Sequence, residues 1–203
     1  MGKHLYCIDS GHAEETPGKR SPKFEDGSRL FEFEFNRSIV EKLTKRLKAA
    51  NIDYFIVTPE RVKDIGLTVR AKRVNELKTD KKKILISIHA NAHGMGQEWT
   101  DANGWEVYTT PGVTKSDQIA ELLFLAHKNE FPEFKMRSDK TDGDNDKEAK
   151  FTIIQQANCP AVLTENFFYT NKKEAALLKD DFFRERIAEA HFRAILAIEK
   201  LKL

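Results

Sequence analysis

Three residues that can bind a metal or move protons follow directly on stretches predicted as strands. His89 closes the apolar run 84–88 within KILISIHANAHG at residues 83–94, His12 closes IDSGH at residues 8–12, and Glu165 closes AVLTE at residues 161–165. A buried strand that ends in a polar residue delivers that residue to the rim of a sheet. Because the functional crevice of an open α/β sheet lies outside the carboxyl ends of its strands, we expect these residues to converge on one site.

This set of residues is suited to zinc chemistry. Two imidazoles and one carboxylate with an open fourth position form the ligand set of a catalytic zinc. The residue types leave the carboxylate ligand open between Glu32, Glu34 and Glu165, and they leave His93, four residues after His89, as a further possible ligand. The ordinary alternative is that a lone histidine such as His89 is a core residue bonded to a backbone carbonyl, so the metal interpretation depends on its partners.

The elements that must position these residues alternate between strands and helices. Strand patterns are predicted at residues 4–9, 53–58, 84–89, 105–109, 151–154 and 161–165, and helical periodicity at residues 30–50, 67–77, 114–129, 171–179 and 181–203. The alternation in FEFEF at residues 31–35 leaves the start of the first helix open between strand and helix. The pattern predicts an α/β fold, a three-layer α/β/α sandwich with a largely parallel sheet of about six strands.

Two segments are expected to be long loops. Residues 13–29 contain prolines and glycines among many charges, which is typical of a loop that carries function. Residues 135–150 are dense in charge, but the positions counted from Asp142 lack the glycine and the glutamate of a calcium-binding loop. We therefore expect a mobile surface loop there.

Composition excludes several classes of protein. The chain has 203 residues, 40% of them hydrophobic and 33% charged, which predicts one globular domain spanning residues 1–203. A net charge of +2 gives no bulk electrostatic case for binding nucleic acid. No apolar run approaches the ~18 residues of a membrane-spanning helix, and we expect no export signal at the N-terminus. Cys7 and Cys159 do not form a CxxC pair and are predicted to be free thiols.

Motifs along nearly the whole chain resemble one enzyme family. They are IDSGH at 8–12, Glu32 four residues before Asn36, LTVRAKRVN at 67–75, SIHANA at 87–92, GWEVYTT at 104–110 and CPAVLTENFFYTN at 159–171. In this order they resemble the zinc-dependent N-acetylmuramoyl-L-alanine amidases of the amidase 3 type, which cut peptidoglycan between the lactyl group of the glycan and the stem peptide. The GKRSP segment and FEFEFN further resemble amidases from phage lysis cassettes of Gram-negative anaerobes.

The resemblance implies a role for each site residue. His12, Glu32 and His89 would bind one Zn²⁺ per chain, and Glu165 would act as the general base that returns a proton to the leaving amine. Glu32 is preferred to Glu34 because it keeps the family's spacing to Asn36. The family commonly has Pro and Gly where this chain has Ser10 and Ala13, and it has no place for His93, which we therefore expect at the surface or beside the ligands.

Other residues are weaker candidates. Asn91 and Asn166 are expected to orient ligands or substrate. Arg70 is a candidate for binding substrate, although an ion pair that holds the fold is the favoured role. Trp105 is expected to be a buried aromatic residue rather than a sugar platform.

Two other functions remain open from the sequence. The same ligands would serve a zinc peptidase that cuts within the stem peptide, and a peptidoglycan-binding module without activity would keep the fold. The partner in every case is peptidoglycan, and no cell-wall-binding domain is expected beside the catalytic one. We expect action at the bacterial cell wall, either as a phage lysin from the host cytoplasm or as an envelope enzyme whose signal has been removed.

Overall fold

The apolar run before His89 forms the buried centre of the sheet. The computed structural model describes residues 2–94, 96–141 and 143–201. In it the run lies within β3 (Lys82–Asn91), which is paired in parallel with β1 (His4–Ser10) on one side and β6 (Ala161–Phe168) on the other. Because these strands run in the same direction, the polar residues at their carboxyl ends meet at one edge of the sheet.

The sheet has six strands in the order β2-β1-β3-β6-β4-β5. It is largely parallel, and β4 (Trp105–Thr109) is antiparallel to β6. The outer strands are β2 (Asp53–Ile56), parallel to β1, and β5 (Lys147–Glu148), parallel to β4.

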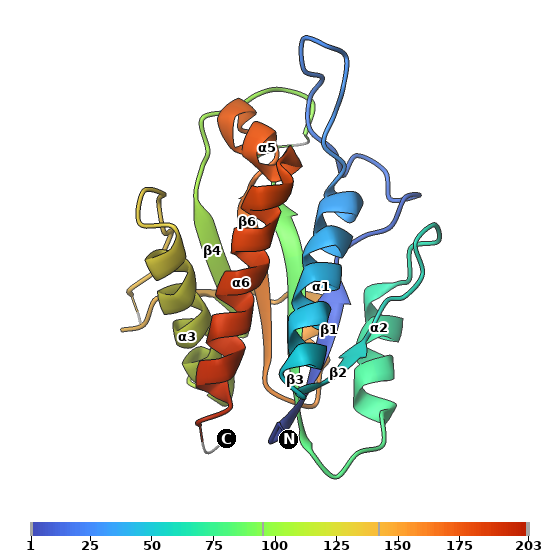
Figure 1. Ribbon diagram of the computed structural model, residues 1–203, viewed down its shortest axis with the longest axis vertical. Helices are drawn as coiled ribbons and strands as arrows, with labels where there is room; N and C mark the ends of the chain where they lie inside the picture. Colours follow the sequence, from blue (N-terminus) through green and yellow to red (C-terminus); the bar gives the residue numbers. More distant parts are fainter. Residues whose placement is uncertain (1, 95, 142, 202–203) are drawn as a thin grey trace.

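Helices cover both faces of this sheet, which confirms the predicted three-layer α/β/α sandwich. The larger core lies under α1 (Glu32–Ala49), α3 (Lys115–Glu130) and α6 (Asp181–Ile198), which lie side by side in front of the sheet in Figure 1. The opposite face is covered by α2 (Leu67–Glu76) and α4 (Thr152–Gln155), over a smaller core that includes Cys7 and Leu85. The short helix α5 (Lys172–Lys179) follows β6 and contacts α6.

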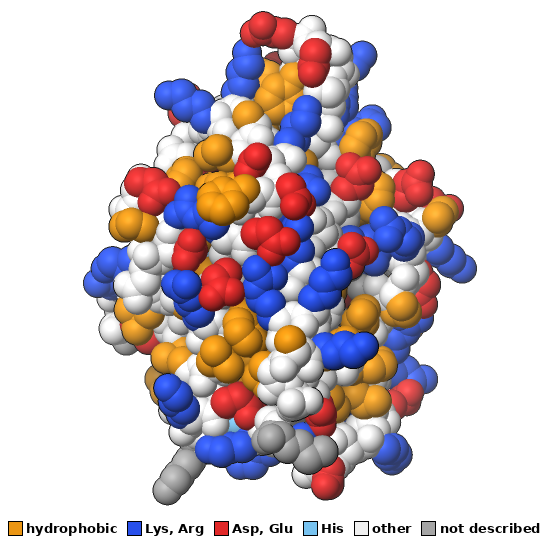
Figure 2. All heavy atoms as spheres, in the orientation of Figure 1, with side chains coloured by type: hydrophobic (Ala, Val, Ile, Leu, Met, Phe, Trp, Pro, Cys, Tyr) orange, Lys and Arg blue, Asp and Glu red, His pale blue; other side chains and the backbone are white. Residues whose placement is uncertain are grey.

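The exposed side of α1 and α6 is held by ion pairs. Lys42 lies 2.7 Å from Glu185 and Arg46 lies 3.1 Å from Glu189, which joins the two helices across their surface. Figure 2 shows positive and negative side chains intermixed over this face, with neither sign forming a broad patch. Exposed pairs of this kind stabilise a fold only modestly, so the apolar layer beneath them is the main source of stability.

One predicted strand is wrong. Residues 152–154 belong not to a strand but to the single helical turn α4, in which Ile153 and Ile154 are buried against the far face of the sheet. A four-residue apolar run has no periodicity that separates strand from helix, and here packing decides. The sixth strand is instead β5, which lies inside the charged segment 135–150 that we expected to be entirely loop.

Other boundaries shift by small amounts. Phe31 forms a single β-bridge with Arg20 and α1 begins at the next residue, so the FEFEF segment belongs almost wholly to the helix. The helix α6 ends at Ile198, whereas the predicted end was at 203. Residues 202–203 of the predicted helix lie outside the described part. Both cysteines are free thiols, as predicted. Within the described ranges, no helix has the length and apolar character to cross a membrane.

Two buried histidines link the helices to the sheet. The imidazole of His127 on α3 lies 3.2 Å from that of His191 on α6, and His191 Nε2 lies 3.1 Å from the hydroxyl of Thr164 on β6. Each ring also has its Nδ1 within 2.9 Å of a carbonyl of the preceding helical turn, so each Nδ1 carries a proton. All of these contacts are made by neutral rings.

This network predicts a loss of stability in acid. Burial lowers the pKa of His191 from 6.5 to about 4, so the unfolded chain binds a proton that the folded chain excludes. The neutral His191 ring makes its full contribution to the free energy of unfolding above about pH 6.5. That free energy falls by on the order of 2–3 kcal/mol as the pH decreases toward 4. We expect urea unfolding at pH 7.5 and 4.5 to show a smaller difference in His191→Gln than in the wild type. The exposed His93 supplies the control His93→Gln; an equal pH difference in all three proteins would contradict the assignment.

Candidate metal centre and catalytic cleft

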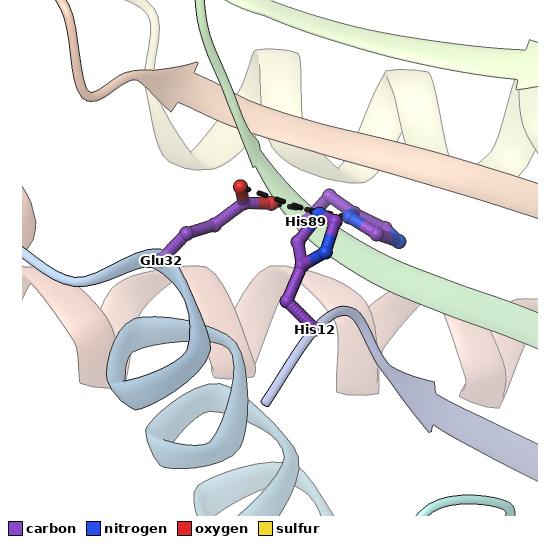
Figure 3. A group of neighbouring side chains, drawn as sticks. All are labelled: His12, Glu32 and His89. Carbon is purple, nitrogen blue, oxygen red and sulfur yellow. Dashed lines mark hydrogen bonds and ion pairs between the residues drawn. The ribbon is translucent and has the colours of Figure 1, made fainter. Parts of the chain in front are cut away.

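The three expected ligands come from three different elements and point toward one another (Figure 3). His12 follows β1, Glu32 is the first residue of α1, and His89 lies near the end of β3. Glu32 Oε1 lies 3.1 Å from His89 Nδ1, and Glu32 Oε2 lies 3.4 Å from His12 Nε2. The structure brings together all three residues that the resemblance implied as ligands.

The spacing of these atoms fits zinc. One potential ligand atom of each residue lies within 4.8 Å of the other two. Zinc–ligand distances of about 2.0–2.1 Å in a tetrahedron place ligand atoms about 3.4 Å apart, close to the two separations from Glu32. Glu32 Oε2 is buried and has no hydrogen-bond partner among the described residues, which is the condition of an oxygen available to a cation.

The turn that carries His12 is fixed by the first helix. His12 has φ of 64°, in the left-handed region that histidine tolerates better than most side chains do. Asn36, one helical turn after Glu32, donates a 2.9 Å hydrogen bond to the carbonyl of Gly11, and Arg37 reaches the carbonyl of His12 at 3.4 Å. Glu32 and Asn36 are four residues apart and therefore lie on one face of α1. This face carries both the candidate ligand Glu32 and the side chain of Asn36, which holds the turn before His12.

The ring of His89 is oriented from behind. The hydroxyl of Ser87 donates a 2.7 Å hydrogen bond to Asp9, and Asp9 is held by the buried guanidinium of Arg70 at 3.1 Å. Since the Ser87 proton is used toward Asp9, its oxygen accepts from His89 Nε2, which lies 3.1 Å away. This fixes a proton on Nε2 and turns Nδ1 toward Glu32, the arrangement that outer partners commonly impose on a metal-binding histidine.

The electrostatics of the site favour a cation. Burial lowers the pKa of His12 to about 4, which keeps this ring neutral at pH 7, as a metal ligand must be. Burial alone would raise the pKa of Glu32 and lower that of His89, but their mutual hydrogen bond and the neighbouring charges move both pKa values the other way. The carboxylate of Glu32 thus lies beside both imidazoles, where it would attract a bound cation.

Glu165 lies on the neighbouring strand and lines the same cleft. It is paired in register with His89, and the next three residues of β6 oppose only two of β3, which is a β-bulge with Phe167 at φ of 64°. The cleft has a volume of about 240 Å³ and is bordered by His12, Glu32, His89 and Glu165. Burial raises the pKa of Glu165 to about 8, with the charges of Glu32 and Glu106 adding to the effect and that of His89 opposing it.

The remaining predicted residues take different positions. Asn91 lines the cleft and donates to Glu106 at 2.5 Å. Asn166 is fully buried and donates a 2.8 Å hydrogen bond to the backbone carbonyl of His89, so it supports the strand behind the ligand. Arg70 is buried against Asp9 and Asp64 and does not border the cleft, which favours the structural role.

Glu34 and His93 are both exposed and lie outside the group of potential ligands. Trp105 is fully buried, as expected, and its indole donates to Asn166 at 2.9 Å.

Several residues of the cleft were not predicted. Lys19 and Tyr169 border it, and Glu106 lies beside Glu165 on β4. Tyr169 directly follows the strand that carries Glu165, so its position at a strand end could have made it a candidate. Lys19 lies in a long loop, where no periodicity in the sequence indicates which way a side chain points. A larger hollow of about 660 Å³ lies between Trp99, Phe134 and α5, away from the three ligands.

Comparison with known proteins agrees with this site and fold. The chain is 30% identical over 202 residues to the endolysin of Bacillus phage SPP1, covering 98% of this chain and 67% of that one. It is 27% identical to the N-acetylmuramoyl-L-alanine amidase LytC of Bacillus subtilis (strain 168), covering 94% of this chain and 34% of that one. The chain thus spans about two thirds of the first relative and about a third of the second. These relatives do not test the narrower resemblance to amidases from phage lysis cassettes of Gram-negative anaerobes.

A solved structure has the same fold. The N-acetylmuramoyl-L-alanine amidase from Clostridium difficile 630 superposes with a TM-score of 0.79 at 23% identity, covering 100% of both chains. The model of the amidase 3 family, described as N-acetylmuramoyl-L-alanine amidase, matches residues 7–197, which include His12, Glu32, His89 and Glu165. This protein therefore belongs to the amidase 3 family of N-acetylmuramoyl-L-alanine amidases.

Proposed function

We propose that this domain is a zinc-dependent hydrolase that cuts the amide bond between the lactyl group of muramic acid and the stem peptide of peptidoglycan. The observation that carries the proposal is the arrangement of four side chains on one cleft. His12, Glu32 and His89 offer ligand atoms at distances that suit zinc, and Glu165 borders the same cleft. One oxygen of Glu165 is buried without a hydrogen-bond partner among the described residues, which leaves it available to water or substrate.

His12, Glu32 and His89 would hold one zinc ion. A bound zinc supplies a Lewis acid that activates water and polarises an amide carbonyl. The lowered pKa of His12 keeps its ring neutral at pH 7. The hydrogen bond to Ser87 places a proton on His89 Nε2, so Nδ1 is the nitrogen of His89 that would bind the ion. Asn36 and Arg37 keep the turn at Gly11 and His12 in place while the ligands act.

Glu165 would move the proton. Its carboxylate takes a proton from the attacking water and gives it to the nitrogen of the leaving amine, so the carboxyl must exchange a proton near working pH. Burial, which raises its pKa to about 8, moves Glu165 from the range of an ordinary glutamate toward that condition. No covalent intermediate is needed. Cys7 and Cys159 belong to the smaller core, on the face of the sheet that α2 and α4 cover.

The place of action would be the bacterial cell wall. Likeness to an endolysin over 98% of this chain favours a role in lysis at the end of a phage cycle, with remodelling of the wall as the other use of the same reaction. Asn91, at the border of the cleft, is the candidate from the sequence that is best placed to touch substrate.

Replacing the carboxylate ligand separates Glu32 from its neighbour Glu34. We expect Glu32→Gln to weaken zinc binding by more than the roughly 10- to 100-fold that follows the loss of an outer-shell partner. Glu34→Gln is the matched control, since Glu34 is two residues away on the same helix and exposed. The measurement is competition for zinc with a chromophoric chelator. Equal zinc affinity in Glu32→Gln and wild type would show that Glu32 is not a ligand.

Replacing the proton carrier should separate metal binding from turnover. Glu165→Gln keeps the size of the side chain but cannot exchange a proton, so we expect a fall in kcat of about 10²- to 10⁴-fold. Zinc content should stay at one ion per chain, measured by elemental analysis after gel filtration. If Glu165→Gln hydrolyses peptidoglycan at the wild-type rate, the proposed mechanism is wrong.

A further inference from the structure

Lys19 is the one lysine or arginine among the described residues that border the catalytic cleft. We propose that its ammonium group binds a carboxylate of the stem peptide and thereby selects substrates in which that carboxyl is free. The inference rests on the proposed function, because it takes the cleft as the place where the scissile amide lies. It assigns a substrate contact to a loop residue that belongs neither to the ligands nor to the proton carrier.

The backbone at Lys19 is held firmly beside the metal centre. Its carbonyl accepts a 3.0 Å hydrogen bond from the amide of Glu32, the first residue of α1. The next residue, Arg20, forms the β-bridge with Phe31. Gly96 packs so closely on this segment that a Cβ there would lie 3.0 Å from the carbonyl oxygen of Arg20. The side chain of Lys19 thus starts from a fixed point within a loop that otherwise has little regular structure.

Lys19 forms no close ion pair within the described part of the chain. Its side chain is partly buried, yet it makes no ion pair or hydrogen bond there. The other cations near the site are neutralised, since Arg137 and Lys147 each lie 2.7 Å from Glu106. A cation that borders a substrate cleft without a counterion is free to pair with an anionic group of the ligand.

The side chain of Lys19 borders the same cleft as the residues that would carry out the reaction. His12, Glu32 and Glu165 border this cleft from three different elements, so a substrate held among them also meets Lys19. The charge of Lys19 also offsets the two carboxylates that would otherwise repel an anionic substrate.

The chemistry of the substrate indicates which carboxylate is bound. The lactyl carboxyl of muramic acid is consumed in the amide that is to be cut, so free carboxylates of a muramoyl peptide lie on the peptide side. An extended chain advances about 3.3–3.6 Å per residue, which places the α-carboxylate of the second residue within about two such steps of the scissile bond. This carboxylate is in some peptidoglycans free and in others amidated, and Lys19 would distinguish the two forms.

The test compares two soluble substrates. One is a disaccharide tripeptide with a free α-carboxylate on its second residue, and the other is the same molecule with that carboxyl amidated. We expect Lys19→Met to raise KM for the first substrate about 10-fold, as for loss of a charged hydrogen bond, and to leave the second nearly unchanged. Lys19→Arg should retain most of the preference. Lys23→Met is the matched control, because Lys23 is exposed on the same loop and does not border the cleft.

A different role for Lys19 gives a different pattern. If Lys19 stabilised the oxyanion of the reaction instead, Lys19→Met would lower kcat for both substrates alike, and this result would overturn the proposal. An unchanged KM for the free-carboxylate substrate would also overturn it.

A binding measurement keeps this test independent of turnover. The dissociation constants of both substrates are measured by calorimetry on zinc-loaded Glu165→Gln, with and without Lys19→Met. If Lys19→Met removes the preference for the free-carboxylate substrate, the carboxylate contact is supported even if the wild type proves to cut another bond. Equal affinities of Glu165→Gln for both substrates would refute the contact. Failure of the wild type to release stem peptides would count against the proposed function alone.

Discussion

The site depends on one close approach, that of the Gly11 backbone to the imidazole of His89. A Cβ at Gly11 would lie 2.0 Å from His89 Cε1, so only glycine leaves room for the ring. Gly11 donates its amide to the carbonyl of Ile88 at 3.0 Å, and its own carbonyl accepts from Asn36. The two strand ends are thereby locked together, and His12 is turned toward the same point as His89. The backbone at Gly11 thus limits where the His89 ring can lie, and the hydrogen bond from its Nε2 to Ser87 sets its orientation.

The fold surrounds this contact with groups that serve different functions. Behind His89, the buried ion pair of Asp9 and Arg70 holds Ser87, and through it the ring tautomer. Removing one member of such a pair would leave a buried charge, so the sheet and α2 are tied to the orientation of the His89 ring. On the side of the cleft, Glu165 Oε2 has no hydrogen-bond partner among the described residues. The rigid side of the site thus faces the core, and the reactive side faces the cleft.

Much of this arrangement could be predicted from the sequence. Strand ends carry strong signals, so His89 and Glu165 were correctly placed at one edge of a parallel sheet. The choice of Glu32 over Glu34 came only from family resemblance, since helical periodicity does not locate a first residue. The contact between Asp9 and Ser87 depends on the register of β1 against β3, which no local pattern encodes. The strand β5 was missed because two residues have no periodicity, and residues 151–154 were assigned wrongly for a similar reason.

The proposed reaction is cleavage, at this site with zinc bound, of the bond between the glycan and the stem peptide. Mass spectrometry of the soluble fragments released from purified peptidoglycan, with zinc-loaded protein and a chelated sample side by side, tests it most directly. We expect intact stem peptides with a free amine on their first residue, released only in the presence of metal. Fragments cut within the stem peptide would contradict it in favour of a peptidase, and the absence of fragments would indicate a binding module.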